Sequence, residues 1–191
     1  MKKKIIFLGY NKNKTRIINF LRKKKYQVIF LGQKKLNTKT FKNFDLILLF
    51  GYRKIIPKRT LSKLNKPPIN LHISYLPFNR GSHPNYWSFI ENTPSGVTIH
   101  EVDKGIDNGK IIYQKKIIFK KKNELTFRNS YNKLIREVEK LFFKNYKSII
   151  NYNYKTKKII SKGTYHKKSE LPKNIKSWDI KIKDYLNKIY E

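Results

Sequence analysis

The chain has 191 residues and no cysteine, carries a formal charge of +33, and is 39% hydrophobic and 14% aromatic. This length fits one domain, and the grouping of the apolar residues into runs excludes an intrinsically disordered chain. The lack of cysteine excludes disulfides and thiolate metal ligands. No apolar run approaches the roughly 20 residues of a membrane span, and the first apolar stretch is too short for a signal peptide. The sequence therefore predicts a cytoplasmic protein.

The positive charge has two interpretations. Clustered lysines attract nucleic acid or an anionic surface. Here, however, the lysines run from Lys2 to Lys188, alanine is absent, and Lys, Ile, Asn, Tyr and Phe are abundant, as expected when nucleotide bias drives the composition. We interpret the lysines mainly as a solvated face that still favours anionic substrates.

Three continuous apolar runs indicate strands in the first part of the chain. They cover residues 3–10, 26–32 and 44–51. Because each run is short and ends near glycine, we expect strands buried on both faces. The segment between the first two runs has an apolar face of helical spacing: Ile17, Ile18, Phe20 and Leu21. A second helix with Pro57 in its first turn and a strand at residues 68–74 follow.

Strands that alternate with helix-length crossovers predict an α/β fold, with a mostly parallel sheet and helices on both faces. Ligands in such folds bind beyond the carboxyl ends of the strands. Residues 95–103 and 109–119 indicate two later strands, and Thr126 is the expected N-cap of a helix that closes the sheet. The apolar positions of that helix are Tyr131, Leu134, Ile135, Val138, Leu141 and Phe142.

The chain loses its long apolar runs after Ile150. We expect a main domain at residues 1–150 and a short C-terminal extension at residues 151–191, which is too short for an ordinary second domain. The extension is interpreted as a small hairpin and a terminal helix, with Trp178 and Leu186 packed on the main domain.

The stretch PINLHISYLPFNRGSHPNYW, at residues 68–87, contains the first candidate chemistry. Asn70 and His72 are two residues apart on a strand, so their side chains share one face. An amide and an imidazolium can both donate to an oxygen that gains negative charge, although two satisfied polar residues at a strand end would look the same. In the following loop, Arg80 and Gly81 bring a cation and a flexible backbone; Arg80 either contacts a substrate or binds loop carbonyls.

A second candidate is the turn VDKGIDNGK, which contains Asp103 and Asp107. A carboxylate near His72 would hold the imidazole charged and relay protons, whereas Asp in such turns often bonds only its own backbone. No close His/Asp ligand spacing supports a metal site. The sequence also lacks a glycine-rich dinucleotide turn and a GxxxxGK[ST] loop, so the α/β pattern does not indicate NAD or ATP.

Together, NLHISYLPFNRGSHPNYW and TPSGVTIHEVDKGIDNGKII resemble the paired signatures of 10-formyltetrahydrofolate-dependent formyltransferases. Those signatures are N-x-H-x-S-x-L-P-x-x-R-G, followed by G-V-T-x-H and D-x-G-x-D-x-G. The match spans much of Pro68 to Ile112. The resemblance implies a Rossmann-like catalytic domain at residues 1–150 that transfers a formyl group from the folate co-substrate to an amine.

The resemblance also implies roles for individual residues. The catalytic residues are Asn70, His72 and Asp107: the first two stabilise an oxyanion, His72 in its protonated form, and Asp107 orients His72 and assists proton transfer. The implied folate-binding residues are Phe50, Gly51, Tyr52, Ile55 and Asp103. The implied substrate-binding residues are Arg80, Gly81, His83, Tyr165 and His166. For His83 and the last two, a purely structural role is the alternative, and His100 is interpreted as structural.

The signatures are most similar to standalone sugar formyltransferases and to the catalytic domain of methionyl-tRNA formyltransferase. Because the tRNA enzyme normally carries an additional C-terminal barrel, the resemblance favours a nucleotide-linked amino sugar as substrate, in glycan or lipopolysaccharide biosynthesis. The alternatives are a methionyl-tRNA formyltransferase-like enzyme that binds tRNA, a formyltetrahydrofolate hydrolase, and a basic nucleic-acid-binding protein on an inactive scaffold. A homodimer is left open.

Overall fold

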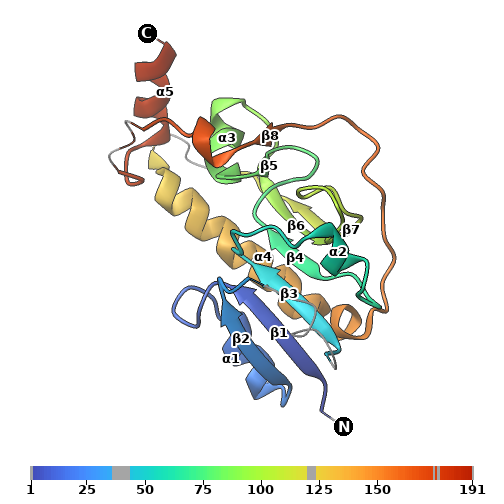
Figure 1. Cartoon of the computed structure of the whole chain (residues 1–191). Helices are drawn as coiled ribbons and strands as arrows, with labels where there is room; N and C mark the ends of the chain where they lie inside the picture. Colours follow the sequence, from blue (N-terminus) through green and yellow to red (C-terminus); the bar gives the residue numbers. More distant parts are fainter. Residues whose placement is uncertain (1, 36–43, 120–123, 174, 176, 191) are drawn as a thin grey trace.

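The structure is a computed structural model, and it describes residues 2–35, 44–119, 124–173, 175 and 177–190 (Figure 1). A six-stranded sheet has the strand order β2-β1-β3-β4-β6-β7. Its strands are β1 (Lys4–Gly9), β2 (Gln27–Gly32), β3 (Leu46–Phe50), β4 (Ile69–His72), β6 (Gly96–Glu101) and β7 (Ile111–Lys116). The first four are parallel, and β6 and β7 are antiparallel to their neighbours. The predicted α/β fold with a mostly parallel sheet is confirmed.

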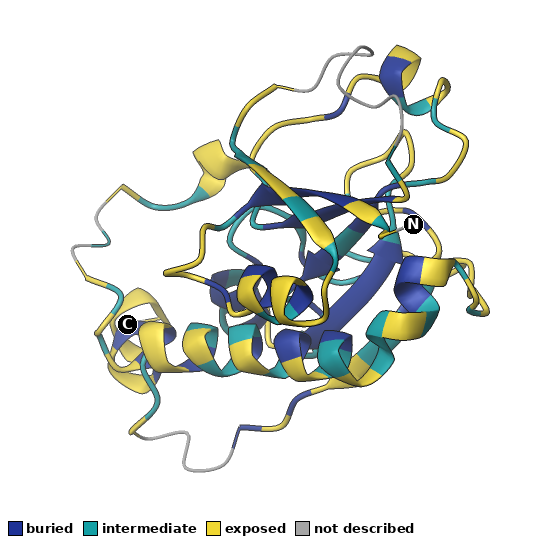
Figure 2. Ribbon diagram, turned by 90° about the horizontal axis from the view of Figure 1, so that it is seen from below, coloured by how far each residue is buried: buried dark blue, intermediate teal, exposed yellow. Residues whose placement is uncertain are grey.

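Helices cover both faces of the sheet, as predicted. On one face, α1 (Ile17–Lys23) and α4 (Phe127–Asn151) pack against β1, β3 and β4 in the largest hydrophobic cluster. Figure 2 shows the buried and exposed stripes of α4. Phe142 is fully buried there, and burial of such a side chain contributes about 1.5–3 kcal/mol. The other face is covered more thinly, by α2 (Lys58–Leu61) and its neighbours around Ile56.

Thr126 caps α4 as expected, because its Oγ1 accepts a hydrogen bond from the backbone N–H of Asn129 at 3.1 Å. This bond satisfies one of the helix's first unpaired N–H groups. None of the helices in the described ranges is long and apolar enough to cross a membrane.

Strand β2 differs from the expectation of burial on both faces. Ile29 and Phe30 are 36% and 39% exposed, whereas β3 is buried throughout. The reason is position: among the described residues β2 pairs only with β1 and forms an edge of the sheet. A continuous apolar run does not distinguish an edge strand from a central one.

The C-terminal extension also differs, because its described residues form no hairpin of their own. Instead, β8 (Tyr165–His166) pairs in parallel with β5 (Arg80–Gly81), which precedes α3 (Pro84–Ile90). A partner so far away in sequence leaves no local turn signal. The 3₁₀ helix η3 (Lys168–Glu170) and the terminal helix α5 (Ile182–Tyr190) follow. As predicted, Trp178 and Leu186 pack on the main body, in a cluster that also contains Tyr86 and Phe127. The division into two units stays a prediction.

Candidate functional site

A cavity of about 700 Å³ opens beyond the carboxyl ends of β3 and β4. Its walls come from the end of β3 and the segment after it (residues 49–56), the end of β4 (residues 70–73), and the turn after β6 (residues 102–107). The segment before and within α3 (residues 81–86), the start of α4 and the extension (residues 165–168) complete them. This is the edge of a parallel sheet at which ligands are expected to bind.

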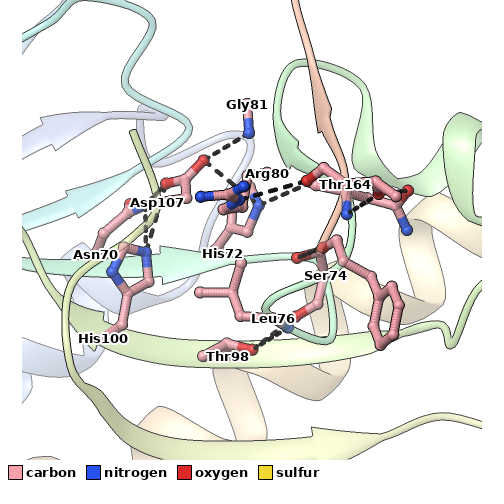
Figure 3. Close-up of polar contacts among 12 residues, drawn as sticks. Asn70, His72, Ser74, Leu76, Arg80, Gly81, Thr98, His100, Asp107 and Thr164 are labelled. Carbon is pink, nitrogen blue, oxygen red and sulfur yellow. Dashed lines mark hydrogen bonds and ion pairs between the residues drawn. The ribbon is translucent and has the colours of Figure 1, made fainter. Parts of the chain in front are cut away.

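Four polar side chains meet at the floor of the cavity (Figure 3). Asn70 and His72 point from one face of β4, as their spacing predicted, and Asp107 reaches them from the turn after β6. Asn70 Nδ2 donates to Asp107 Oδ1 at 3.1 Å, and His72 Nε2 lies 3.6 Å from Asp107 Oδ2. The three residues that the sequence selected therefore converge on one point.

The fourth member is His100, which the sequence interpretation called structural. It faces Asn70 across the β4–β6 pairing, and its Nε2 lies 3.1 Å from Asn70 Nδ2 and 3.5 Å from Asp107 Oδ1. Its Nδ1 lies 2.7 Å from the carbonyl of Glu101, which can only accept, so Nδ1 carries a hydrogen. The sequence could have indicated His100 as a site residue through the motif GVTIH, of which His100 is the last residue.

Asp107 is held as a carboxylate. The Gly81 backbone N–H donates to its Oδ2 at 2.9 Å, and the Asn70 amide donates to its Oδ1. Burial alone would raise the pKa of Asp107 and is the largest single influence. His72, His100 and the Gly81 N–H together outweigh it, and they hold the pKa well below its ordinary value of 3.8. Because the ionised carboxylate only accepts, it fixes the Asn70 amide with its nitrogen toward the cluster.

His72 is almost fully buried, with 8% of its surface exposed. Its Nε2 lies 3.4 Å from the backbone oxygen of Asn79 and 3.6 Å from the Asp107 carboxylate. Both neighbours accept, so Nε2 carries the hydrogen. Burial lowers the pKa of His72 below its ordinary value of 6.5, Asp107 opposes this effect only in part, and His100 adds to it. This direction favours the neutral ring in the structure without substrate, whereas the resemblance implied a protonated His72 at the oxyanion, which stays a prediction.

We expect the imidazole of His72 to titrate below pH 6.5 in the folded protein. A histidine whose folded pKa is lowered stabilises the fold fully above its unfolded pKa, and this contribution is lost as the pH falls through the folded value. The free energy of unfolding should therefore decrease on acidification below pH 6.5. Nuclear magnetic resonance (NMR) titration of the ring protons checks the midpoint, and a midpoint at or above 6.5 would contradict the assignment.

The residues implied for folate binding all lie along this cavity. Phe50, Gly51, Tyr52 and Ile55 line it at the end of β3, where Phe50 is also part of the core and Ile55 is 75% exposed. Asp103 lines it too, and its Oδ1 accepts from the backbone N–H of Gly105 at 2.8 Å, the local turn bond named as the alternative.

Sequence reasoning missed Gln33, which anchors this wall. Its Nε2 donates to the Gly51 carbonyl and its Oε1 accepts from the Arg53 N–H, each at 2.9 Å.

Of the residues implied for substrate binding, Gly81, His83, Tyr165 and His166 line the cavity. His83 stacks on Trp178 with ring centroids 5.7 Å apart, and His166 stacks on Trp87 at 4.0 Å.

Arg80 behaves differently from these residues. Its Nη1 donates to Asn108 Oδ1 at 3.1 Å and its Nε to the Thr164 carbonyl at 3.4 Å. These contacts agree with the alternative given in the sequence analysis, in which Arg80 has a structural role and binds loop groups instead of a substrate.

The charge of the cavity favours an anionic ligand. Six basic side chains line it, against the carboxylates of Asp103 and Asp107. The basic residues are Arg53, Lys54, Lys104, Arg128, Lys167 and Lys168. Within the described part of the chain, no group of three or more His, Asp and Glu residues is placed to hold a metal ion.

An α/β sheet with an amide, imidazoles and a carboxylate gathered at the carboxyl ends of its strands defines a class of enzyme that handles a small ligand by acid–base and electrostatic catalysis. The comparisons with known proteins narrow this class. The profile of the family described as Formyl transferase matches residues 11–144. The chain belongs to the formyltransferase family.

A crystal structure of the formyltransferase PseJ from Anoxybacillus kamchatkensis resembles this chain along nearly the whole length of both. The identity is 35%, the match covers 94% of this chain and 96% of that one, and the TM-score is 0.86. That structure contains UDP-4,6-dideoxy-4-formamido-L-AltNAc and tetrahydrofolate.

Two curated relatives match over shorter stretches. The methionyl-tRNA formyltransferase of Thermodesulfovibrio yellowstonii is 40% identical over 76 residues, which are 39% of this chain and 25% of that protein. The dTDP-4-amino-4,6-dideoxyglucose formyltransferase of Mycobacterium bovis is 27% identical over 127 residues, 66% of this chain and 53% of that protein. The chain thus spans about a quarter to a half of the length of these relatives.

Proposed function

We propose that this chain transfers a formyl group from 10-formyltetrahydrofolate to the amine of a nucleotide-linked amino sugar. The observation that carries the proposal is the convergence of Asn70, His72 and Asp107 in one basic cavity at the carboxyl ends of the strands. Similarity to PseJ over nearly the full length supports the same substrate classes, because PseJ was crystallised with tetrahydrofolate and a UDP-linked formamido sugar.

The chemistry proceeds through one tetrahedral intermediate. The amine nitrogen attacks the formyl carbon, a new C–N bond forms, and the carbonyl electron pair moves to the oxygen. The bond to the folate nitrogen then breaks as that nitrogen takes a proton, and the product is a formamide. For catalysis, the protein must stabilise the negative oxygen and move one proton from the amine to the folate nitrogen.

We assign the negative oxygen to Asn70 and His72. Among the described residues, the His72 Nε2–H group makes long contacts only, at 3.4 and 3.6 Å, so it can turn to a substrate oxygen without breaking a strong bond. The Asn70 amide uses its nitrogen for Asp107 and His100, and we propose that it exchanges the contact to His100 for the substrate. Asp107, ionised at the start, orients both donors; it takes up the amine proton through water and then gives it to the folate nitrogen.

The two ligands occupy different walls of the cavity. We place the folate along residues 49–56, where Leu49, Ile55 and Ile56 supply apolar surface and the backbone around Gly51 and Tyr52 supplies hydrogen-bonding groups. We place the nucleotide on the opposite wall. There Lys167 and Lys168 offer positive charge for a diphosphate, whereas the nearby Arg128 already pairs with Asp179 at 2.6 Å.

Arg80, which the resemblance implied as a substrate-binding residue, is not assigned to the diphosphate, because its guanidinium bonds Asn108 and the Thr164 carbonyl. The stacked rings of His83 and Trp178 lie on the same wall and offer an aromatic surface beside the charges.

An assay with a panel of amines tests the function. Purified protein is incubated with 10-formyltetrahydrofolate and UDP-, GDP- or dTDP-linked 4-amino-4,6-dideoxy sugars, and the products are followed by mass spectrometry. We expect formamide to form with at least one nucleotide-linked sugar. An amino sugar without a nucleotide should not react, because it lacks the diphosphate that the basic side chains bind.

Three other outcomes would contradict the proposal. Formylation of methionyl-tRNA alone would overturn the substrate class. Formate release without an amine would indicate a hydrolase. Salt-sensitive binding of RNA without folate binding would indicate a nucleic-acid-binding protein.

A further inference from the structure

One short segment of backbone contacts both reactive side chains of the cavity. The carbonyl of Asn79 lies 3.4 Å from His72 Nε2, and the N–H of Gly81 donates to Asp107 Oδ2 at 2.9 Å. Residues 79–82 therefore set the position of the imidazole and of the carboxylate at the same time. Figure 3 shows the Gly81 nitrogen above Asp107, with Arg80 and Thr164 beside it.

The C-terminal extension holds this segment. The N–H of Asn79 donates to Thr164 Oγ1 at 2.8 Å, and the N–H of Arg80 donates to the Thr164 carbonyl at 3.0 Å. On the other side of Gly81, the N–H of Ser82 donates to the His166 carbonyl at 2.9 Å. Because N–H groups alternate in direction along a strand, bonding residues 80 and 82 to β8 turns the Gly81 N–H the opposite way, toward Asp107.

The extension is itself anchored by the buried ring of His166. The ring stacks on Trp87, with centroids 4.0 Å apart and planes 10° apart. Its Nδ1 lies 3.3 Å from a Glu170 carboxylate oxygen, and its Nε2 lies 3.0 Å from Glu91 Oε1 without hydrogen-bond geometry. Upstream, Gly163 passes so close to the loop before β5 that a Cβ there would lie 2.0 Å from the Pro77 carbonyl oxygen.

We propose that Thr164 and His166 are positioning residues for the reaction: by templating residues 79–82 they aim the Gly81 N–H at Asp107 and the Asn79 carbonyl at His72. This inference rests on the proposed function only for the chemical roles of Asp107 and His72. On this proposal the C-terminal extension positions the backbone of the site, and it also packs on the main body through α5.

The substitution Thr164→Val tests this inference, because it keeps the side-chain shape and removes the hydroxyl that binds Asn79. We expect kcat to fall roughly 10- to 100-fold, as for other small displacements of reacting groups, with KM for both substrates nearly unchanged. In the free protein, hydrogen exchange of the Gly81 amide, followed by NMR, should become at least several times faster. Thr164→Ser retains the hydroxyl and should restore both values.

Two further variants separate positioning from stability. Tyr190→Phe removes the 2.9 Å hydrogen bond that the hydroxyl of Tyr190, at the end of α5, donates to the Ile90 carbonyl. This bond lies away from β8, so hydrogen exchange of the Gly81 amide and kcat should stay unchanged. Glu170→Gln, on a half-exposed side chain, weakens only the support of His166 and should give a smaller change in the direction of Thr164→Val. It keeps the test valid if Thr164→Val does not fold.

Unchanged Gly81 exchange in both Thr164→Val and Glu170→Gln would overturn the inference. Faster Gly81 exchange with no formyl transfer by the parent protein would leave the positioning intact and refute only the proposed reaction.

Discussion

Replacing Asp107 by Asn should lower kcat by roughly 10²- to 10⁴-fold, the range typical of a group that takes part in proton transfer. The carboxylate accepts from the Gly81 N–H with one oxygen and from the Asn70 amide with the other. An asparagine side chain has one acceptor oxygen and one donor nitrogen, so one of these bonds becomes a donor-to-donor contact. The negative charge that faces His72 is lost as well. KM should change much less than kcat, which steady-state kinetics with the amino-sugar substrate will measure.

A matched control is Asp45→Asn. Its Oδ2 accepts a hydrogen bond from the backbone N–H of Lys4 at 2.8 Å, at the opposite end of the strands from the cavity. This variant changes the same charge without touching the site, and its kcat should equal that of the parent protein. If Asp107→Asn also kept its kcat while circular dichroism showed an intact fold, Asp107 would not be part of the chemistry.

The central part of the fold and site could be predicted because its signals are local. Apolar runs separated by helix-length segments define β1, β3 and β4, and the spacing of Asn70 and His72 places both on one strand face. The convergence of Asp107 with them depends on a turn whose motif could be compared with a family pattern. The strands and the shared face of Asn70 and His72 are each fixed within a few residues, whereas the long-range convergence with Asp107 was predicted from the family pattern.

The features that could not be predicted depend on pairings between distant residues. Whether β2 lies at an edge is decided by the strands that do or do not flank it. The pairing of β8 with β5 joins residues 85 apart, and this pairing draws the Arg80 guanidinium toward the Thr164 carbonyl. His100 enters the cluster through its position opposite Asn70 in an antiparallel pair, which the sequence does not specify.

Replacing Gly81 by Ala should reduce both stability and activity. Gly81 has φ of +87°, and a Cβ there would lie 2.4 Å from the His166 backbone oxygen and 2.9 Å from the Tyr165 ring. The strained backbone costs about 1–2 kcal/mol, and the overpacking adds about 1–3 kcal/mol because the nearest atom belongs to a backbone. We expect the free energy of unfolding to fall by about 2–5 kcal/mol in denaturant titrations. Because the collision separates β5 from β8, the Gly81 N–H moves away from Asp107, and kcat should fall roughly 10²-fold.

The variant Gly32→Ala separates the cost of backbone strain from the cost of overpacking. Gly32 also has a positive φ, +56°, but the atom nearest to a Cβ there is the ring carbon Cζ of Phe30 at 3.3 Å, on a side chain that is 39% exposed and can move. Only the backbone strain remains, so the free energy of unfolding should fall by about 1–2 kcal/mol with kcat unchanged. Equal losses of stability in the two variants would show that β8 yields to the new methyl group without strain. A Gly81→Ala protein with full activity would show that the distance from the Gly81 N–H to Asp107 does not limit the reaction.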